Sequence, residues 1–522
     1  MEHAVSELAS IDYVILGAYM VGMLAIGTFY AKYVHTAGDL FLAGRALPFW
    51  AIGLSIVVSD IGAIDLVSGS GAAYEYGIAQ ANFDWLGSVP AVLIAAFIFV
   101  PYYWRAGVYT IPEFLGRRYN VAVQMIEALI WFAFLSVNVS VMLYLSAVFL
   151  GEVLDWNVEF SIWLTAVFVG IYTVSGGLSA VVMTDVLQMV VMFVGAGSLL
   201  VLGLWEAGGW EDVVEAVKAQ PNAPADYFQL LAPHAADTPY PWTGIVFGLG
   251  IVMSTAYFVG NQAVLQRALG ARSEWDAKAG LITAGFFKLF IPLLMFVPGL
   301  TGRALWPDLA KADTAVPRMV AELLPPGLMG LMFAAFLAAL MSSVDSYLNS
   351  CSTMFMTDVY GRGYHLATGR NLGDRQGMVL GRIVTVVVLL IAAFAAPQFS
   401  RFATIYTAIQ GFLALFQGPT LAILLLGIMW PRATRWGGLS GLVLGVCMTS
   451  FLTFEGDRLF PSQDPFLFVS FWSFLFSLAV TAVVSLLTPR EPPEKLRGLV
   501  MSSVMQDAEA ESLLAERVAG HE

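Results

Sequence analysis

Two carboxylates and a glycine lie close together inside an apolar stretch near residue 60. Residues 55–65 read Ser-Ile-Val-Val-Ser-Asp-Ile-Gly-Ala-Ile-Asp, within a segment that is otherwise long enough to cross a lipid bilayer. A charge at the bilayer centre costs roughly 2.5–3.5 kcal/mol even on the most lenient scale. Asp60 and Asp65 therefore indicate an ion path or a substrate path, unless partners elsewhere neutralise them.

Hydroxyl side chains form a second group, between residues 339 and 346. Helical spacing places Ala339, Ser343 and Ser346 on one face, with Ser342 beside them. Hard cations prefer oxygen ligands, so two serine hydroxyls together with carbonyls freed by a broken neighbouring helix are a candidate Na⁺ site. The competing interpretation is that these serines bond back to their own helix.

Two further acids bear on this choice. Asp345 lies next to the serine stripe, and Asp185 lies in another apolar segment that could face the same pocket. A carboxylate in such surroundings is costly without a cation, so both residues favour the ion-site interpretation.

The elements that position these residues are membrane helices. The chain has 522 residues, of which 58% are hydrophobic and 12% are charged, and its mean hydropathy is +0.76. This composition indicates a polytopic membrane protein. Neither the two cysteines nor the five histidines have metal-site spacing, and no phosphate-binding G-x-x-x-x-G-K-[S/T] occurs. We therefore expect no enzyme, no ATP-driven pump and no cofactor, and the net charge of −13 does not indicate nucleic-acid binding.

Length and charge predict the topology. With about 20 apolar residues for each crossing, the sequence predicts an all-α protein with about 13 transmembrane helices. Lys and Arg residues concentrate in the segments that become cytoplasmic if the N-terminus is outside and the C-terminus is inside. The predicted spans lie near residues 11–33, 47–73, 81–104, 122–150, 158–175, 181–206, 241–263, 277–301, 323–357, 377–398, 402–429, 437–453 and 465–488.

Two of these spans look interrupted, the second at residues 60–65 and the seventh at residues 254–261. They are five spans apart, as an inverted repeat of five plus five helices with broken helices at equivalent positions requires. The alternative is that Gly62 and Gly260 only allow close helix packing. The predicted organisation is an N-terminal helix (1–33), a first repeat (47–206), a second repeat (241–429), two C-terminal helices (437–488) and a cytoplasmic tail (489–522).

Several short runs resemble the sodium/solute symporter family, and most of all its sodium–glucose cotransporter branch. The resemblance covers about residues 11–488. It implies a five-plus-five broken-helix fold and sodium-coupled transport. The runs are Ala43-Gly-Arg45, Tyr109-Thr-Ile-Pro-Glu-Phe, Ile171-Tyr-Thr-Val-Ser-Gly-Gly-Leu, Thr184-Asp-Val-Leu-Gln, Gln262-Ala-Val-Leu-Gln-Arg and Ala338-Ala-Leu-Met-Ser-Ser.

The resemblance also implies a sodium site between the second and ninth spans. Its ligands would be the carbonyls of Val58, Ile61 and Ala339 and the hydroxyls of Ser342 and Ser343. Some members have a second sodium site, and its residues here would be Asp185, Ser342 and Ser346, to which Asp345 adds a carboxylate that the family pattern does not lead us to expect. The number of sodium ions therefore stays open.

For sugar-transporting members, the resemblance implies substrate contacts at Asp60, Asp65, Asp84, Tyr257, Lys288 and Gln410. Polyols suit such a set because carboxylate, amide and ammonium groups can each meet a hydroxyl. The extra acids could instead balance Lys288 or attract a cationic substrate, and Lys288 could be only their counter-ion. Tyr257 and Phe258 form either an aromatic floor for the substrate or ordinary packing.

We therefore expect a multi-pass protein of the plasma (inner) membrane that imports a small polar solute with sodium, by alternating access. A sugar or polyol is the favoured substrate, and the expected partners are the solute, Na⁺ and the lipid bilayer. The alternatives are a sodium symporter for a carboxylate, an amino acid or a cationic compound, proton coupling through Asp60 or Asp65, and a sensor with a transporter fold.

Overall fold

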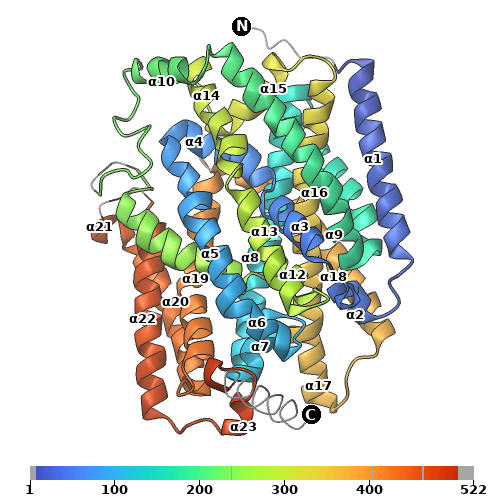
Figure 1. Cartoon of the computed structure of the whole chain (residues 1–522), viewed down its shortest axis with the longest axis vertical. Helices are drawn as coiled ribbons and strands as arrows, with labels where there is room; N and C mark the ends of the chain where they lie inside the picture. Colours follow the sequence, from blue (N-terminus) through green and yellow to red (C-terminus); the bar gives the residue numbers. More distant parts are fainter. Residues whose placement is uncertain are drawn as a thin grey trace, which may run out of the picture.

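The computed structural model describes residues 8–503 apart from 235, 237, 403, 404, 461 and 463. This part of the chain is almost entirely helical and contains two isolated β-bridges but no β-strand (Figure 1). Ten helices are long and apolar enough to cross a membrane, or up to twelve if each bent pair counts as one span. The predicted class, an all-α polytopic membrane protein, is confirmed. Most of the predicted tail, from residue 504 onward, lies outside the described residues.

Both predicted helix breaks are present. Helix α3 (Phe49–Asp60) ends where Ile61 leaves the helical conformation, and the chain turns by 54° into the π-helical η2 (Ile64–Gly69) and α4 (Ser70–Tyr76). In the second break, η6 (Gly244–Met253) and α11 (Ser254–Gly260) are separated by the extended Asn261 from α12 (Gln262–Leu269), with a bend of 52°. The two interrupted segments therefore have nearly the same bend.

A third interruption lies in α9 (Val158–Glu206). Gly177 has φ +61° and ψ 179°, a backbone conformation that glycine adopts without steric cost, so it separates the two predicted spans 158–175 and 181–206. The first apolar part, Val158–Ile171, is shorter than a full crossing. The count of thirteen helices therefore stays a prediction.

The most buried helix lies at the centre of the bundle. Helix α16 (Leu328–Met354) continues as a helix to Thr368, and 83% of the residues in the most apolar 18-residue stretch of this segment are buried. The corresponding share in α1 (Ser10–Ala31) is 11%. Helices α8 (Val121–Leu154), α9 and α3 pack against α16, whereas α1 lies at one edge of Figure 1 and α22 (Phe466–Leu487) at the other. The broken helix α3 therefore meets the central helix α16 in the interior.

The remaining helices complete the bundle and its surface turns. The α-helices are α2 (Ala37–Leu42), α5 (Val89–Ile94), α6 (Val100–Ala106), α7 (Ile111–Arg118), α10 (Trp210–Lys218), α13 (Glu274–Lys288), α14 (Val297–Leu305), α15 (Ala315–Leu323), α17 (Arg362–Thr368), α18 (Asp374–Ala395), α19 (Ile405–Met429), α20 (Arg435–Phe454), α21 (Gly456–Leu459) and α23 (Pro493–Leu496). The 3₁₀ and π turns are η1 (Ala43–Arg45), η3 (Ile78–Ala81), η4 (Phe83–Ser88), η5 (Ala95–Phe99), η7 (Pro292–Phe296), η8 (Ala312–Thr314), η9 (Phe355–Gly361) and η10 (Ala396–Arg401).

Candidate ion and substrate sites

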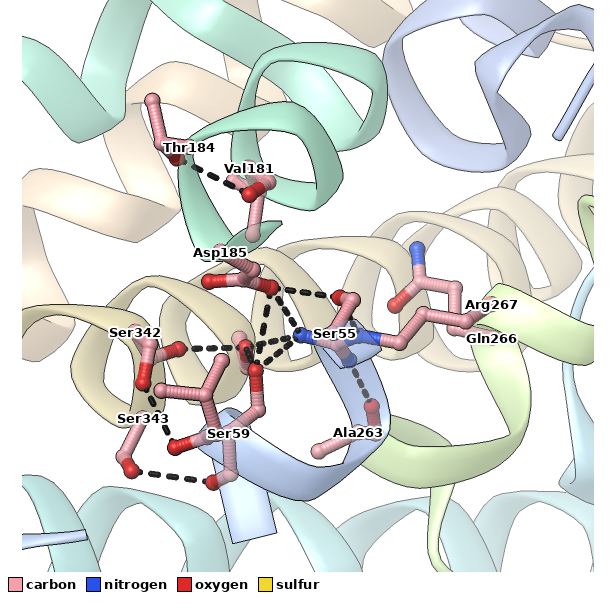
Figure 2. Close-up of polar contacts among 12 residues, drawn as sticks. Ser55, Ser59, Val181, Thr184, Asp185, Ala263, Gln266, Arg267, Ser342 and Ser343 are labelled. Atoms are coloured by element: carbon pink, nitrogen blue, oxygen red, sulfur yellow. Dashed lines mark hydrogen bonds and ion pairs between the residues drawn. The ribbon is translucent and has the colours of Figure 1, made fainter. Parts of the chain in front are cut away.

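The two oxygen-bearing segments meet in the interior. The Ser342 hydroxyl donates to the carbonyl oxygen of Val58 at 2.7 Å, and the Ser343 hydroxyl donates to that of Ser59 at 2.9 Å. Both hydroxyls also reach the Ala339 carbonyl, at 3.3 and 3.1 Å, and both serines are fully buried. Figure 2 shows the two serines beside Ser59. Four of the five predicted sodium ligands thus lie in one place, and their roles as ligands stay a prediction.

The fifth predicted ligand, Ile61, lies at the break itself. It ends α3 with φ −95° and ψ 86°, which are not helical values. The next residue, Gly62, packs so closely that a Cβ there would lie 2.7 Å from the Ser343 hydroxyl and 2.6 Å from Met142 Cε. A side chain at position 62 would therefore require Met142 and Ser343 to move.

Asp185 lies beside this group and already has three donors on one oxygen. Its Oδ2 accepts hydrogen bonds from the hydroxyls of Ser55 at 2.5 Å and Ser59 at 3.1 Å. The third donor is Nη2 of Arg267, which lies 3.2 Å away and forms an ion pair with Asp185 (Figure 2). Both charged side chains are almost completely buried, with exposed fractions of 0% and 1%.

Arg267 is a site residue that sequence reasoning missed. Its Nη2 also donates to the Ser59 hydroxyl at 2.5 Å and to the hydroxyl of Ser346. In the sequence it was only the last residue of the Gln262–Arg267 run. The signal that could have identified it is charge complementarity, because a basic residue beside apolar helices needs an acid such as Asp185.

The four residues of the predicted second sodium site have different hydrogen-bond partners. Asp185 and Ser346 both bond to Arg267, whereas Asp345 accepts a hydrogen bond from Thr173 on α9. Ser342 bonds to the α3 break. The guanidinium of Arg267 therefore contributes one positive charge next to two of the four predicted residues.

A cavity of about 100 Å³ lies close to the α3 break, and all six predicted substrate residues line it. These residues come from six elements, α3, η2, η4, α11, α13 and α19. Of these, η2 and η4 are π-helical and α11 continues the π-helical η6, and such turns are frequent at functional sites. The six residues are Asp60, Asp65, Asp84, Tyr257, Lys288 and Gln410.

Lys288 connects two of the acids. Its ammonium nitrogen lies 2.5 Å from Asp60 Oδ2 and 2.7 Å from Asp84 Oδ1, and it is only 3% exposed. Lys288 is therefore the counter-ion of both acids as well as a lining residue. The third acid, Asp65, accepts a backbone hydrogen bond from Gly62 at 3.3 Å.

Charged groups and amides both line the cavity, and they come from different elements. The three acids and Lys288 come from α3, η2, η4 and α13, whereas the amides of Asn138, Gln410 and Gln417 come from α8 and α19. Sequence reasoning missed Asn138 and Gln417. Gln417 lies seven residues after Gln410, a helical spacing that places both on one face and could have indicated it.

Aromatic side chains pack at two sides of the cavity. Next to the loop that leads from α10 to η6, the ring of Phe83 packs against Tyr406 at 5.2 Å and Tyr240 at 5.5 Å between ring centroids. We call these three residues the upper aromatic layer.

The second layer lies where α11 ends, near the Asn261 break. Trp131 packs against Phe416 at 5.1 Å, against Phe134 at 5.7 Å and against Tyr257 at 6.4 Å. We call these four residues the lower aromatic layer. Tyr257 thus belongs both to the cavity lining and to a packed aromatic cluster, and its contact with a substrate stays a prediction.

Comparison with known proteins identifies relatives over nearly the whole chain. The sodium:solute symporter family matches residues 40–445. The sodium/glucose cotransporter of Vibrio parahaemolyticus is 30% identical, over 95% of this chain and 94% of its own length. The sodium/myo-inositol cotransporter of Canis lupus familiaris is 32% identical, over 94% of this chain and 75% of its own.

A solved structure has the same fold. It is that of a Na⁺-coupled sialic acid symporter in a substrate-bound outward-open state, with a TM-score of 0.80 and 23% identity. The match covers 93% of this chain and 99% of the symporter chain. At this level of identity the likeness concerns the fold alone.

Proposed function

Because this chain belongs to the sodium:solute symporter family, we propose that it is a sodium-coupled symporter that imports a sugar or a related polyol by alternating access. The observation that carries the proposal is the cavity itself. Asp60, Asp84, Lys288 and Gln410 line one cavity. Asp60 lies two residues after Val58, whose carbonyl oxygen accepts a hydrogen bond from Ser342. A polar substrate and a sodium ion would therefore bind to the same broken helix.

The sodium ion would lie between α3 and α16. The proposed ligands are the carbonyls of Val58, Ile61 and Ala339 and the hydroxyls of Ser342 and Ser343, which are the hard oxygen donors that such a cation prefers. Support comes from the 2.7 Å contact between Ser342 and Val58, because it holds a hydroxyl and a carbonyl of two helices within reach of one ion.

Coupling would follow from the shared helix. Val58 lies on the ion side and Asp60 on the substrate side of the same last turn of α3. An ion that orders this turn also positions Asp60, so sodium tightens substrate binding. The substrate must then tighten sodium binding by the same factor.

The driving force is sufficient for accumulation. One charge that crosses about 100 mV provides about 2.3 kcal/mol. At about 1.4 kcal/mol for each factor of ten, this supports roughly a fortyfold solute gradient before any sodium gradient is added.

A polyol matches the lining because it offers several hydroxyls, and the cavity offers carboxylates, amides and an ammonium group to meet them. A ligand without hydroxyls would leave these buried groups unpaired, at a cost of about 1–3 kcal/mol each.

The second candidate is a cationic solute. Three acids and one lysine line the cavity, and Asp65 is outside the Lys288 ion pairs, which favours a substrate with a positive charge.

Uptake into proteoliposomes tests the proposal. The purified protein is given an inward sodium or potassium gradient, with labelled D-glucose, D-mannose and myo-inositol as probes and a panel of cationic amino compounds beside them. We expect sodium-dependent accumulation of at least one of the three polyols. Uptake that follows a pH gradient and does not depend on sodium would instead indicate proton coupling. Uptake of cationic compounds alone would favour the second candidate. The absence of any accumulation would favour a sensor.

A further inference from the structure

We propose that Gln417 binds a pair of substrate hydroxyls and thereby determines which polyols the protein accepts. The inference rests on the proposed function and names a specificity residue within it. Gln417 lies on α19 and lines the cavity, yet neither the sequence pattern nor the family resemblance identified it.

The amide of Gln417 is buried but has no hydrogen-bond partner in the part of the protein that the structure describes. Its side chain is 0% exposed, and both Oε1 and Nε2 are without a partner. A buried polar group without a partner costs about 1–3 kcal/mol, and such groups are rare in native structures. Because the side chain lines the substrate cavity, the substrate is the partner that can satisfy both atoms.

The chemistry of an amide limits the kind of group that fits. Oε1 accepts a hydrogen bond and Nε2 donates up to two. A carboxylate only accepts and an ammonium only donates, so either one would satisfy half of the amide. Two neighbouring hydroxyls can donate to Oε1 and accept from Nε2 at the same time, which makes a polyol the matching ligand class.

Gln417 continues the row of amides along α19 that Gln410 begins. It lies seven residues after Gln410, about 10 Å further along α19 on the same face. The neighbouring residue, Phe416, belongs to the lower aromatic layer. The two amides therefore contact different ends of a substrate whose other side meets Lys288 and the acids.

The competing explanation is structural. Pro419 interrupts the hydrogen bonding of α19 two residues later, so Gln417 could serve only to fill space beside an irregular turn. A structural role would affect stability and would reduce uptake of every probe by the same factor. A binding role changes the ranking of the probes, and this difference is the measured quantity.

The test compares Gln417→Leu with the wild-type protein, both in proteoliposomes under the same sodium gradient. The half-saturating concentrations of D-glucose, D-mannose and myo-inositol and of their monodeoxy analogues are measured. We expect the affinity for the best polyol to fall by about tenfold, as the loss of two hydrogen bonds implies. One monodeoxy analogue lacks the hydroxyl that Gln417 contacts. For this analogue, Gln417→Leu should lower the affinity by less than half of the tenfold factor, because the wild-type protein already lacks the interaction.

Gln188→Leu is the matched control. Gln188 is also 0% exposed, but it lies on α9, outside the cavity lining, and donates to the Tyr19 hydroxyl. We expect wild-type ranking of the probes in this variant, even if its thermal stability in detergent falls. If Gln417→Leu cannot be recovered from the membrane, Gln417→Asn replaces it, because the shortened amide withdraws from the substrate but stays polar.

The outcomes separate this inference from the proposed function. Unchanged affinities in the Gln417 variant, or affinities that fall by one common factor for all probes and analogues, would overturn the role of Gln417 and leave the symporter proposal intact. If the wild-type protein accumulates none of the polyols with sodium, both proposals fail together.

Discussion

Arg267 and Asp185 form an ion pair in the interior of the helix bundle, with 3.2 Å between Nη2 and Oδ2. The two residues come from α12 and α9, which are far apart in the sequence. Removing one partner of a buried pair leaves an uncompensated charge, whereas removing both does not. This relationship changes how substitutions near the predicted second sodium site should be interpreted.

The first prediction concerns stability. Asp185→Asn alone and Arg267→Gln alone should each destabilise the protein by about 3–5 kcal/mol, because one buried charge loses its partner. The double variant should recover much of this loss, as measured by thermal unfolding in detergent. Glu322→Gln, which breaks the partly exposed pair with Arg318, serves as the control and should have an effect of at most about 1 kcal/mol. Additive losses in the double variant would contradict a structural pair.

The second prediction concerns the serine hydroxyls. Ser343→Ala removes one proposed oxygen ligand and the bond to the Ser59 carbonyl. Since a hydrogen bond or ligand contact to a charged group corresponds to about 1.5–3 kcal/mol, half-saturating sodium should rise roughly tenfold to a hundredfold, with near-normal expression. Ser352→Ala is the control, because Ser352 is buried on the same helix but donates to Gly381. Unchanged half-saturating sodium in Ser343→Ala would remove Ser343 from the site.

A third prediction addresses Lys288. Lys288→Ala should abolish uptake of a polyol, because it removes an ammonium group from the cavity and leaves Asp60 and Asp84 without their shared partner. Lys278→Ala is the matched control on the same helix, where the lysine pairs with Glu274 and is 32% exposed, and it should transport normally. Normal uptake by Lys288→Ala would leave Lys288 as a structural counter-ion only.

A fourth prediction concerns the break in α3. In Gly62→Ala, the new Cβ would meet the Ser343 hydroxyl at 2.7 Å, so the serine must move away from the break. We expect sodium-dependent uptake to be lost while sodium-independent binding of a polyol is weakened less. Gly285→Ala provides the comparison, because its Cβ would find its nearest neighbour at an ordinary 3.5 Å. Wild-type sodium affinity in Gly62→Ala would show that the close packing at the break is not required.

The sequence was informative where composition and local chemistry decide the structure. Acids and glycines inside apolar segments predicted both broken helices, and the structure has them at Ile61 and Asn261. The helix breaks depend on residues that differ in type from their apolar neighbours, so a single sequence can reveal them. The six predicted substrate residues came from the family resemblance, and all of them line one cavity.

Other features depend on contacts between distant segments. Nothing in the neighbourhood of Arg267 indicates that Asp185, 82 positions away, is its partner. The same holds for Asp345, whose bond from Thr173 on α9 could not be read from the serine stripe. The spacing from Gln410 could indicate that Gln417 lies on the same face of α19, but its unpaired, buried amide beside the cavity is visible only in the structure.

The two aromatic layers have a consequence for the speed of the protein. We expect the rings of Phe83 and Tyr406 on one side, and of Trp131 and Phe416 on the other, to separate and repack when a solute enters or leaves. Collective rearrangements of this kind take microseconds to milliseconds. Turnover should therefore be limited by ring and helix motion rather than by diffusion of the solute, and it should depend on temperature far more steeply than flow through an open pore.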